Sequence, residues 1–403
     1  MEADLPRDYD IVVYGATGFT GALVAEYLQT HHSEIRWAIA GRSLPKLESV
    51  KKQLGNAQLP TIEADSESAA DMARLAGATK VIISTVGPYA QYGTKLLEAC
   101  AAEGTHYCDL TGEPQWMAAV FEKVSDMAEE SGARLVHCCG FDSIPSDLGV
   151  FVAQKIMRER HGVYATHVSG RMGLSKGAVS GGTVASMLLA MEQGVKDPIA
   201  RKALNNPYAL YPVELDPGVD GADQKGVKWD DNFDSWTGPF VMAAVNSKVV
   251  RRSNALASLI YGADFAYDEA MLTTNRRSAL LLAGGMGAGM LAFAIGPLRR
   301  MIAKKLPQPG EGPSPSEREN GFFEFFVHAK HPDSTKNDVR VAVKGKRAPG
   351  YGATSRMIAQ AGLCLAFDDL DVEGGIWTPA TALGTHLVDR LATVDVVFEE
   401  QAL

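Results

Sequence analysis

The sequence predicts an α/β fold: an N-terminal Rossmann-type, doubly wound parallel sheet over residues 1–150, and a second α+β domain with a mixed or antiparallel sheet over residues 151–403. The stretch Tyr9–Gly21, YDIVVYGATGFTG, joins a β-branched strand to a helix through three glycines. Strand and helix patterns then alternate until about residue 160, as they do in βαβ units. Beyond that point, segments such as 339–344 (VRVAVK) alternate apolar and mostly polar residues, which suits a sheet with one wetter face.

The glycine turn predicts a dinucleotide site. Gly15, Gly18 and Gly21 separate a strand over 10–14 from a helix whose apolar positions recur at helical spacing. Glycine allows a tight turn and lets the backbone approach a pyrophosphate, while the free N–H groups of the new helix attract the anion. The spacing is G-x-x-G-x-x-G rather than G-x-G-x-x-G, but it lies in the strand–turn–helix context that such a site requires.

The second strand, over 36–40, indicates which nucleotide binds. Arg42 and Ser43 follow it, where an NAD site would normally place an acidic residue for the ribose 2′-hydroxyl. The guanidinium of Arg42 suits a 2′-phosphate, and Ser43 can add a hydroxyl. We therefore expect NADP(H) rather than NAD(H). Asp65, after a short strand, either faces the adenine or caps the helix that begins near Ser66.

Further strands are expected at 80–84, from residue 106, and at 134–138. The first runs into the loop 85–89 at the carboxyl end of the sheet, the edge where open α/β sheets bind ligands, so this loop should meet the ribose and nicotinamide. The predicted cofactor-binding residues are Gly15, Ala16, Thr17, Gly18, Phe19, Thr20, Gly21, Arg42, Ser43, Asp65, Thr85, Val86, Gly87, Pro88 and Tyr89.

Catalytic candidates follow from the same strand exits. A reductase needs a group that neutralises the charge developing after hydride transfer. The candidates are Tyr89, Asp109, Glu113, Asp142 and Ser143, of which Tyr89, Asp142 and Ser143 are the predicted catalytic residues. Each also has a structural explanation. Tyr89 can stack beside the nicotinamide, Asp109 can fix its own turn, and Asp142 and Ser143 can cap the helix that follows.

The second half predicts strands at 322–328 and, more weakly, at 263–270. Helices are expected at 183–193 and 353–367, and each follows glycines that could hold a second anion or simply form a flexible loop. Residues 306–320 are rich in proline and glycine and are expected to be a linker without a packing face.

Residues 279–298 form an uncharged run of twenty, with two arginines shortly before it and two directly after it. That length could span a bilayer, but a span would separate residues 322–403 from the rest of the same fold. We expect instead a helix that lies in the membrane interface or lines an apolar substrate channel. Buried packing is the alternative, and a stripe of small residues also allows contact between subunits, as in a homodimer.

Composition excludes some functions. A net charge of −9 without a basic block argues against binding nucleic acid. Five scattered cysteines suit a reducing compartment, and the acidic start of the chain lacks the apolar core of a secretory signal, so a cytoplasmic protein is expected. Cys138 and Cys139 are adjacent and the histidines lack a metal-binding spacing, so no metal site is expected.

Six motifs resemble the saccharopine dehydrogenase-like oxidoreductases: GATGFTG, AGRS at 40–43, TVGPY at 85–89, YCDLTGE at 107–113, GFDSIPSDLG at 140–149 and GGIWTPATALG at 374–384. Together they cover essentially the whole chain, and they are most similar to the branch of the trans-acting enoyl reductases, which also holds a membrane- or lipid-droplet-associated animal homologue.

The resemblance implies an NADPH-dependent reductase of a double bond in a lipid- or polyketide-linked acyl substrate. An imine or amino-acid dehydrogenase like saccharopine reductase is one alternative. A catalytically silent, membrane-associated nucleotide-binding protein is another.

Overall fold

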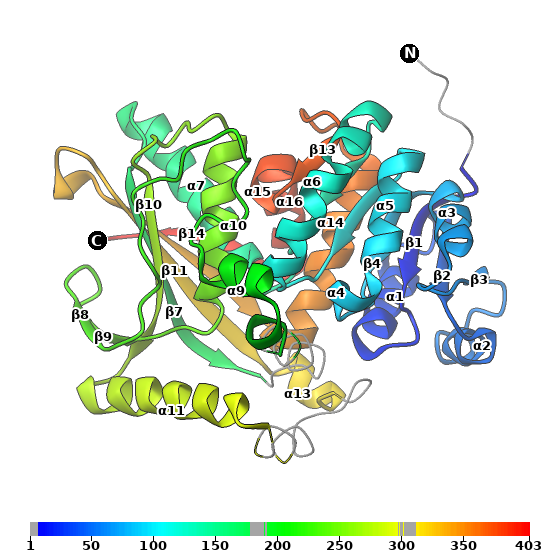
Figure 1. Cartoon of the computed structure of the whole chain (residues 1–403), viewed down its shortest axis with the longest axis horizontal. Helices are drawn as coiled ribbons and strands as arrows, with labels where there is room; N and C mark the ends of the chain where they lie inside the picture. The colour runs from blue at the N-terminus through cyan, green and yellow to red at the C-terminus, as the bar shows by residue number, and fades with distance from the viewer. Residues whose placement is uncertain (1–6, 178–188, 190–191, 297, 299–300, 302–311) are drawn as a thin grey trace.

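The computed structural model describes residues 7–177, 189, 192–296, 298, 301 and 312–403. In this part of the chain two seven-stranded sheets lie side by side, the first built mainly from the N-terminal residues and the second from the middle and end of the chain (Figure 1). Helices fill the space between them. The expected α/β class, with one parallel and one mixed sheet, is confirmed.

Sheet A is parallel throughout, in the order β13-β6-β5-β4-β1-β2-β3. Its strands are β1 (Tyr9–Tyr14), β2 (Trp37–Gly41), β3 (Thr61–Glu63), β4 (Thr79–Ser84), β5 (His106–Asp109), β6 (Arg134–Val136) and β13 (Gly375–Trp377). The direction of strand order reverses between β1 and β4. Open α/β sheets bind their ligands at the carboxyl ends of the strands beside such a reversal.

Both faces of sheet A are buried. Ile11 and Val13 of β1 belong to the core beneath α1 (Phe19–His31) and α14 (Thr354–Phe367), whereas Val12 faces the core on the opposite side. The helices α3, α5 and α6 contribute to that second core, so β1 reads as a continuous apolar run. The first half of the chain also contains α2 (Leu44–Gln53), α3 (Ala69–Gly77), α4 (Tyr89–Tyr92), α5 (Thr94–Glu103) and α6 (Pro114–Ser131).

Sheet B has the order β14-β12-β11-β7-β10-β9-β8; β7 and β10 are parallel and the other pairs antiparallel. Its strands are β7 (His167–Lys176), β8 (Lys228–Asp230), β9 (Ser235–Gly238), β10 (Ala266–Thr273), β11 (Phe322–Lys330), β12 (Val339–Lys346) and β14 (Val396–Gln401). The helices α7 (Ile144–His161) and α10 (Ala243–Leu256) cover the face turned toward sheet A. Shorter elements are α9 (Pro198–Asn205), η1 (Thr335–Asn337), η2 (Pro349–Ala353), α15 (Pro379–Ala382) and α16 (Gly384–Ala392).

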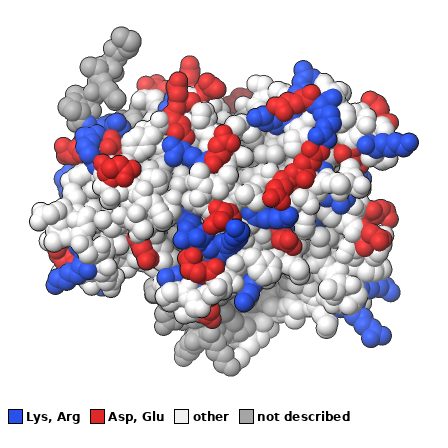
Figure 2. Space-filling view, turned by 180° about the vertical axis from the view of Figure 1, so that it is seen from behind, with Lys and Arg blue, Asp and Glu red and all other residues white. Residues whose placement is uncertain are grey.

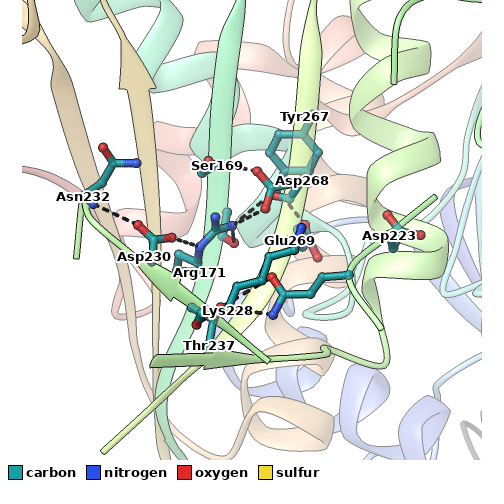
Figure 3. A network of polar contacts seen from close by, with 12 residues as sticks. Ser169, Arg171, Asp223, Lys228, Asp230, Asn232, Thr237, Tyr267, Asp268 and Glu269 are labelled. Atoms are coloured by element: carbon teal, nitrogen blue, oxygen red, sulfur yellow. Dashed lines mark hydrogen bonds and ion pairs between the residues drawn. The ribbon is translucent and has the colours of Figure 1, made fainter. Parts of the chain in front are cut away.

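A buried charge network joins three strands of sheet B (Figure 3). The Arg171 guanidinium on β7 lies 2.6 Å from a carboxylate oxygen of Asp230 on β8 and 2.8 Å from one of Asp268 on β10. Ser169 donates a further hydrogen bond to Asp268 at 3.0 Å. Because the Arg171 side chain is only 7% exposed, the two carboxylates help to offset the cost of burying the cation. The network therefore fixes the short strand β8 to the body of the sheet.

The chain returns to sheet A after most of sheet B is complete. β13 pairs with β6 as the seventh strand, and α14 packs so closely on β4 that a Cβ on Gly362 would lie 2.5 Å from Cδ1 of Ile83. The expected division at residue 150 did not include this return. Residues 354–377 complete the first sheet and tie the two halves of the chain together.

The expected strands at 263–270 and 322–328 and the helix at 353–367 are present, with ends shifted by a few residues. Most of the expected helix at 183–193 lies outside the described residues. In the expected linker, 306–311 also lie outside them, but the remainder contains α13 (Pro315–Glu319). That part of the prediction is wrong because Ser314 and Glu317 form a capping box that starts a short helix.

The apolar segment forms α11 (Arg276–Ala294), which lies along the lower edge of the molecule in Figure 1. Ala279 is buried, and Leu282 packs against the backbone of Gly238 on β9. The opposite side is open to solvent, where Leu281 is 77% and Leu291 67% exposed. Buried packing thus explains only one side of this helix. None of the helices in the described part of the chain has the length and apolar character needed to cross a membrane.

Candidate functional site

The three glycines between β1 and α1 have different structural roles. Gly15 has a φ of +92°, which residues with a side chain rarely adopt, and a Cβ there would lie 2.7 Å from Oγ1 of Thr85. A Cβ on Gly21 would overlap the carbonyl oxygen of Gly15, so this glycine lets α1 pack on the turn. Gly18 has only one close neighbour, that same carbonyl oxygen at 3.3 Å. Its position therefore leaves space beside the helix start.

That helix start is suited to an anion. Gly18 is the residue before α1, no side chain caps the helix, and its first turn contains no acidic residue. The first N–H groups of a helix have no partner within it, so Phe19, Thr20 and Gly21 present donors toward the space beside Gly18. Of the other predicted turn residues, Thr17 is exposed, whereas Ala16 is fully buried and contributes only its backbone to the site.

Arg42 follows β2 at the same edge of the sheet. A Cβ on Gly41, the residue before it, would lie 3.7 Å from Oγ1 of Thr17, so Arg42 begins beside the glycine turn. Its side chain is exposed, and none of the described carboxylates forms an ion pair with it. Ser43 precedes α2 without capping it through its hydroxyl. Both side chains are thus available to a 2′-phosphate.

Asp65 lies nearby but does not cap α3. Its carboxylate accepts the N–H of Glu67 at 3.0 Å, within a local turn. Ser68 caps the helix instead, by accepting the N–H of Asp71 at 3.2 Å. The capping alternative for Asp65 is wrong because α3 begins at Ala69, about three residues later than expected. Contact of Asp65 with the adenine stays a prediction.

The loop after β4 lies next to the glycine turn. Thr85 donates hydrogen bonds from its backbone N–H (3.0 Å) and its hydroxyl (3.2 Å) to the carbonyl oxygen of Tyr14. Thr85 therefore stabilises the turn, and the neighbouring loop residues are the ones that can contact a nucleotide. Val86 and Pro88 are partly exposed and Gly87 is exposed, so these three residues line the open side of the loop.

The side chain of Tyr89 is buried and hydrogen-bonded to the backbone, unlike that of a residue that donates a proton to a substrate. Its side chain is 4% exposed, its hydroxyl donates to the carbonyl oxygen of Ser84 at 3.0 Å, and it accepts the N–H of Leu110 at 3.1 Å. Burial raises the pKa of this phenol well above its usual value. The hydroxyl thus connects the ends of β4 and β5, and Tyr89 acts here as a support for the site.

Glu113 and Asp109 also support neighbouring backbone. The two carboxylate oxygens of Glu113 accept the N–H groups of Tyr89 and Ala90, each at 2.9 Å, and so hold the start of α4. Asp109 accepts the N–H of Thr111 at 3.1 Å, as expected for a residue that fixes its own turn. It also contacts Nδ1 of His137 at 2.8 Å. Both acidic side chains are fully buried.

Asp142 and Ser143 lie together at the end of β6 but in different environments. Ser143 is 1% exposed, and its hydroxyl donates to the amide oxygen of Asn246 at 2.9 Å without capping α7. Asp142 is partly exposed, and none of the described residues donates a hydrogen bond to its carboxylate. Burial raises the pKa of Asp142 to about 6. Of the three predicted catalytic residues, Asp142 alone has a reactive group that no described side chain or backbone group occupies.

Sequence reasoning missed the side chains behind Ser143. Asn246 on α10 donates to Glu269 on β10 at 3.1 Å, and Tyr267 donates to the same carboxyl at 2.7 Å. Glu269 is fully buried, and this burial raises its pKa to about 7. Asn246 lies 103 positions after Ser143 in the sequence, and Glu269 lies still further along, so no local motif marks the contact. Through these hydrogen bonds, the loop after β6 of sheet A is joined to β10 of sheet B.

No metal site is formed by the described residues, since no three His, Cys, Asp or Glu side chains gather as ligands would. The five cysteines are all buried and free, and Cys138 and Cys139 lie at the end of β6, as expected. On the face shown in Figure 2, Lys and Arg lie beside Asp and Glu, and the view shows no continuous basic area.

Comparison with known proteins agrees with this geometry. Residues 11–136 match the family model for the saccharopine dehydrogenase NADP binding domain. A Mycobacterium tuberculosis protein, named provisionally as a trans-acting enoyl reductase, is 38% identical over 99% of both chains. The trans-acting enoyl reductase of Mycobacterium leprae is 36% identical over 97% of both chains.

Among solved structures, apo saccharopine dehydrogenase (L-Glu forming) from Saccharomyces cerevisiae is similar with a TM-score of 0.54. The match covers 98% of this chain and 100% of that one at 12% sequence identity. At that identity the likeness supports the fold alone.

Proposed function

The chain belongs to the saccharopine dehydrogenase-like, NADP-dependent oxidoreductases, and on that premise we propose that it reduces the carbon–carbon double bond of an enoyl thioester carried by a lipid or polyketide. The names of its full-length mycobacterial relatives support this substrate class. The open helix start beside Gly18 and the unpaired Arg42 fit the pyrophosphate and 2′-phosphate of NADPH.

The observation that carries the chemistry is Asp142. The chemistry that NADPH would supply when bound is a hydride for the β-carbon of the enoyl group, so this chain must supply a proton for the α-carbon. Asp142 lies at the carboxyl edge of sheet A, free of protein hydrogen bonds in the described part of the chain, with a pKa of about 6. A carboxyl with that pKa is about one-tenth protonated at pH 7, so it can both donate the proton and recover it from water.

Ser143 and the network behind it position this acid. The hydroxyl of Ser143 donates a hydrogen bond to Asn246, which in turn donates one to Glu269. Glu113 fixes the start of α4, next to the loop that is expected to face the nicotinamide. Buried hydrogen bonds thus fix both the loop after β4 and the loop after β6, which preorganises the site for hydride and proton transfer.

The test measures NADPH oxidation with a series of long-chain enoyl thioesters. Wild-type kcat should fall as pH rises through about 6, because only protonated Asp142 donates. Asp142→Asn should lower kcat by a factor of roughly 10² to 10⁴, with NADPH binding unchanged. Asp126→Asn, an exposed acid on α6, is the matched control.

Turnover of an imine formed from an amine and an oxo acid, without turnover of enoyl thioesters, would favour the amino-acid dehydrogenase alternative. NADPH binding with neither turnover would favour the silent protein.

We also propose that α11 contacts a lipid surface. Its outer side presents Leu280, Leu281, Met290 and Leu291, each more than half exposed, and Arg276 and Arg277 lie exposed at its first turn. An apolar stripe beside basic residues suits the interface of an anionic membrane, where a poorly soluble acyl substrate would be found. Such a contact would make the chain a peripheral membrane protein. The alternative, which the flotation test described in the Discussion distinguishes, is that the outer side of α11 contacts a second copy of the chain.

A further inference from the structure

Part of the second half of the chain packs on the cofactor turn. Phe19, the first residue of α1, meets the ring of Tyr351 edge to face at 4.6 Å between centroids. The guanidinium carbon of Arg318, on α13, lies 5.5 Å from the centre of the same Phe19 ring. Gly312 also approaches this ring so closely that a Cβ there would overlap it. The anion-binding end of α1 is therefore bordered by residues from beyond position 311.

The backbone of Arg318 is held in place. Its carbonyl oxygen accepts the N–H of Ala348 at 2.8 Å, and the capping box of α13 fixes the preceding turn. The next residue, Glu319, accepts hydrogen bonds from Arg347 at 2.8 Å and from Arg356 at 3.4 Å. These contacts join α13 to the segment that enters α14, which itself packs on sheet A and α1.

The charges around α13 are unequally paired. Arg347 pairs with Glu319 and Asp395, and Arg356 pairs with Glu319. Arg318 is partly buried over Phe19, and none of the described carboxylates lies within ion-pair distance of it. A cation without an ion-pair partner among the described residues thus lies over the ring of the first residue of α1, and no side chain caps the first N–H groups of that helix. Both features favour an anion at this end of α1.

We propose that Arg318 binds the pyrophosphate of NADPH, so that a residue from the second half of the chain completes the cofactor site. The inference rests on the nucleotide site described above and adds a residue that lies far outside the NADP-binding segment 11–136. The planar guanidinium can form two hydrogen bonds to phosphate oxygens while its carbon remains over the Phe19 ring.

The pyrophosphate assignment separates Arg318 from Arg42. Arg42 is expected to contact the 2′-phosphate, which distinguishes NADPH from NADH, whereas both nucleotides carry the pyrophosphate. Adenosine 2′-monophosphate carries the 2′-phosphate and no pyrophosphate. Loss of Arg318 should therefore weaken NADPH and NADH alike and leave adenosine 2′-monophosphate unaffected. Loss of Arg42 should instead weaken NADPH and adenosine 2′-monophosphate and leave NADH unaffected.

The experiment measures the dissociation constants of the full chain by nicotinamide fluorescence, with adenosine 2′-monophosphate as a competitor. Arg318→Gln should raise the Kd for NADPH about tenfold, the smaller effect expected when a charge-assisted hydrogen bond is lost. Arg318→Lys should restore part of the affinity, because lysine keeps the charge without the planar fork. Arg201→Gln removes the same charge from an exposed position on α9 and should change nothing.

Melting temperatures without nucleotide identify variants that fail to fold, and Arg318→Met, which keeps the packing on Phe19, then replaces Arg318→Gln. A Kd for NADPH within twofold of wild type in Arg318→Gln would overturn the proposal. Equal weakening of adenosine 2′-monophosphate would also overturn it, since it would indicate a general electrostatic effect. If Arg42→Gln behaves as expected in the same assay, the assignment of NADPH as cofactor stands whatever Arg318→Gln shows. A wild type that binds no nucleotide would overturn both that assignment and the proposal for Arg318.

Discussion

Two apolar helices from the second half of the chain have opposite environments. α14 is buried along nearly its whole length, between sheet A and the helices α1 and α16. α11 is similarly apolar, but among the described residues it packs mainly on β9 and β10, near one edge of sheet B, and exposes its other side. Composition alone therefore does not determine burial. A helix is buried when a second surface covers it, and the described residues supply that surface for α14 but not for the outer side of α11.

Glycine has a different role in each helix. A Cβ on Gly362 of α14 would meet Ile83 at 2.5 Å, so glycine there permits close contact with the sheet. A Cβ on any of four glycines of α11 would meet nothing within 4 Å: Gly284, Gly285, Gly287 and Gly289. Among the described residues these glycines serve no packing contact, and each carries the helix-weakening entropy cost of glycine.

The largest expected difference is in the free energy of unfolding after truncation of a leucine. Leu363→Ala on α14 should destabilise the protein by about 2–5 kcal/mol, because the side chain is 2% exposed and its loss leaves a cavity. Leu281→Ala on α11 should change stability by less than about 0.5 kcal/mol, since that side chain is already in solvent. Urea unfolding of both variants measures the contrast. Similar losses in the two variants would show that α11 is covered in solution.

A smaller effect of opposite sign is expected at the glycines. Gly362→Ala gains about 1 kcal/mol of helix propensity but crowds Ile83, and overpacking costs about 1–3 kcal/mol, so it should lower stability. Gly287→Ala gains the propensity without a clash and should raise stability by up to about 1 kcal/mol. Thermal melts of the two variants test the sign. A destabilised Gly287→Ala would indicate that another helix or subunit approaches α11 closely.

Much of the first sheet could be predicted because its signals are local. The β-branched run at Tyr9–Tyr14, the glycine turn and the recurring strand–helix pattern each lie within a few residues. The return of β13 and α14 to sheet A could not be predicted, because it depends on pairing between segments more than 200 residues apart. Likewise, a proline- and glycine-rich composition did not reveal that Ser314 caps a short helix.

The candidate site divides in the same way. Gly18 and Arg42 follow from position within a known strand–turn–helix pattern, and the structure leaves both open to a ligand. Tyr89 and Ser143 are predicted catalytic residues because they follow strands, but position after a strand does not show which way a hydroxyl points. Both hydroxyls are bonded to protein groups, and the partners of Ser143 and Phe19 lie on distant elements.

Substitutions on the exposed side of α11 should have the smallest effect on stability but should change whether the protein binds membranes. Leu281→Ser with Leu291→Ser removes two exposed apolar groups from α11, so the melting temperature and NADPH affinity should stay near wild type. Wild type should float with anionic liposomes, and the double variant should remain in the unbound fraction because it has lost apolar area that enters the lipid interface. Val213→Ser with Val219→Ser is the matched control, since both valines are exposed elsewhere in the second half of the chain. If wild type does not float but forms a dimer that the α11 variant dissociates, the exposed face is covered by a second subunit, and the difference between α11 and α14 disappears in the assembled protein.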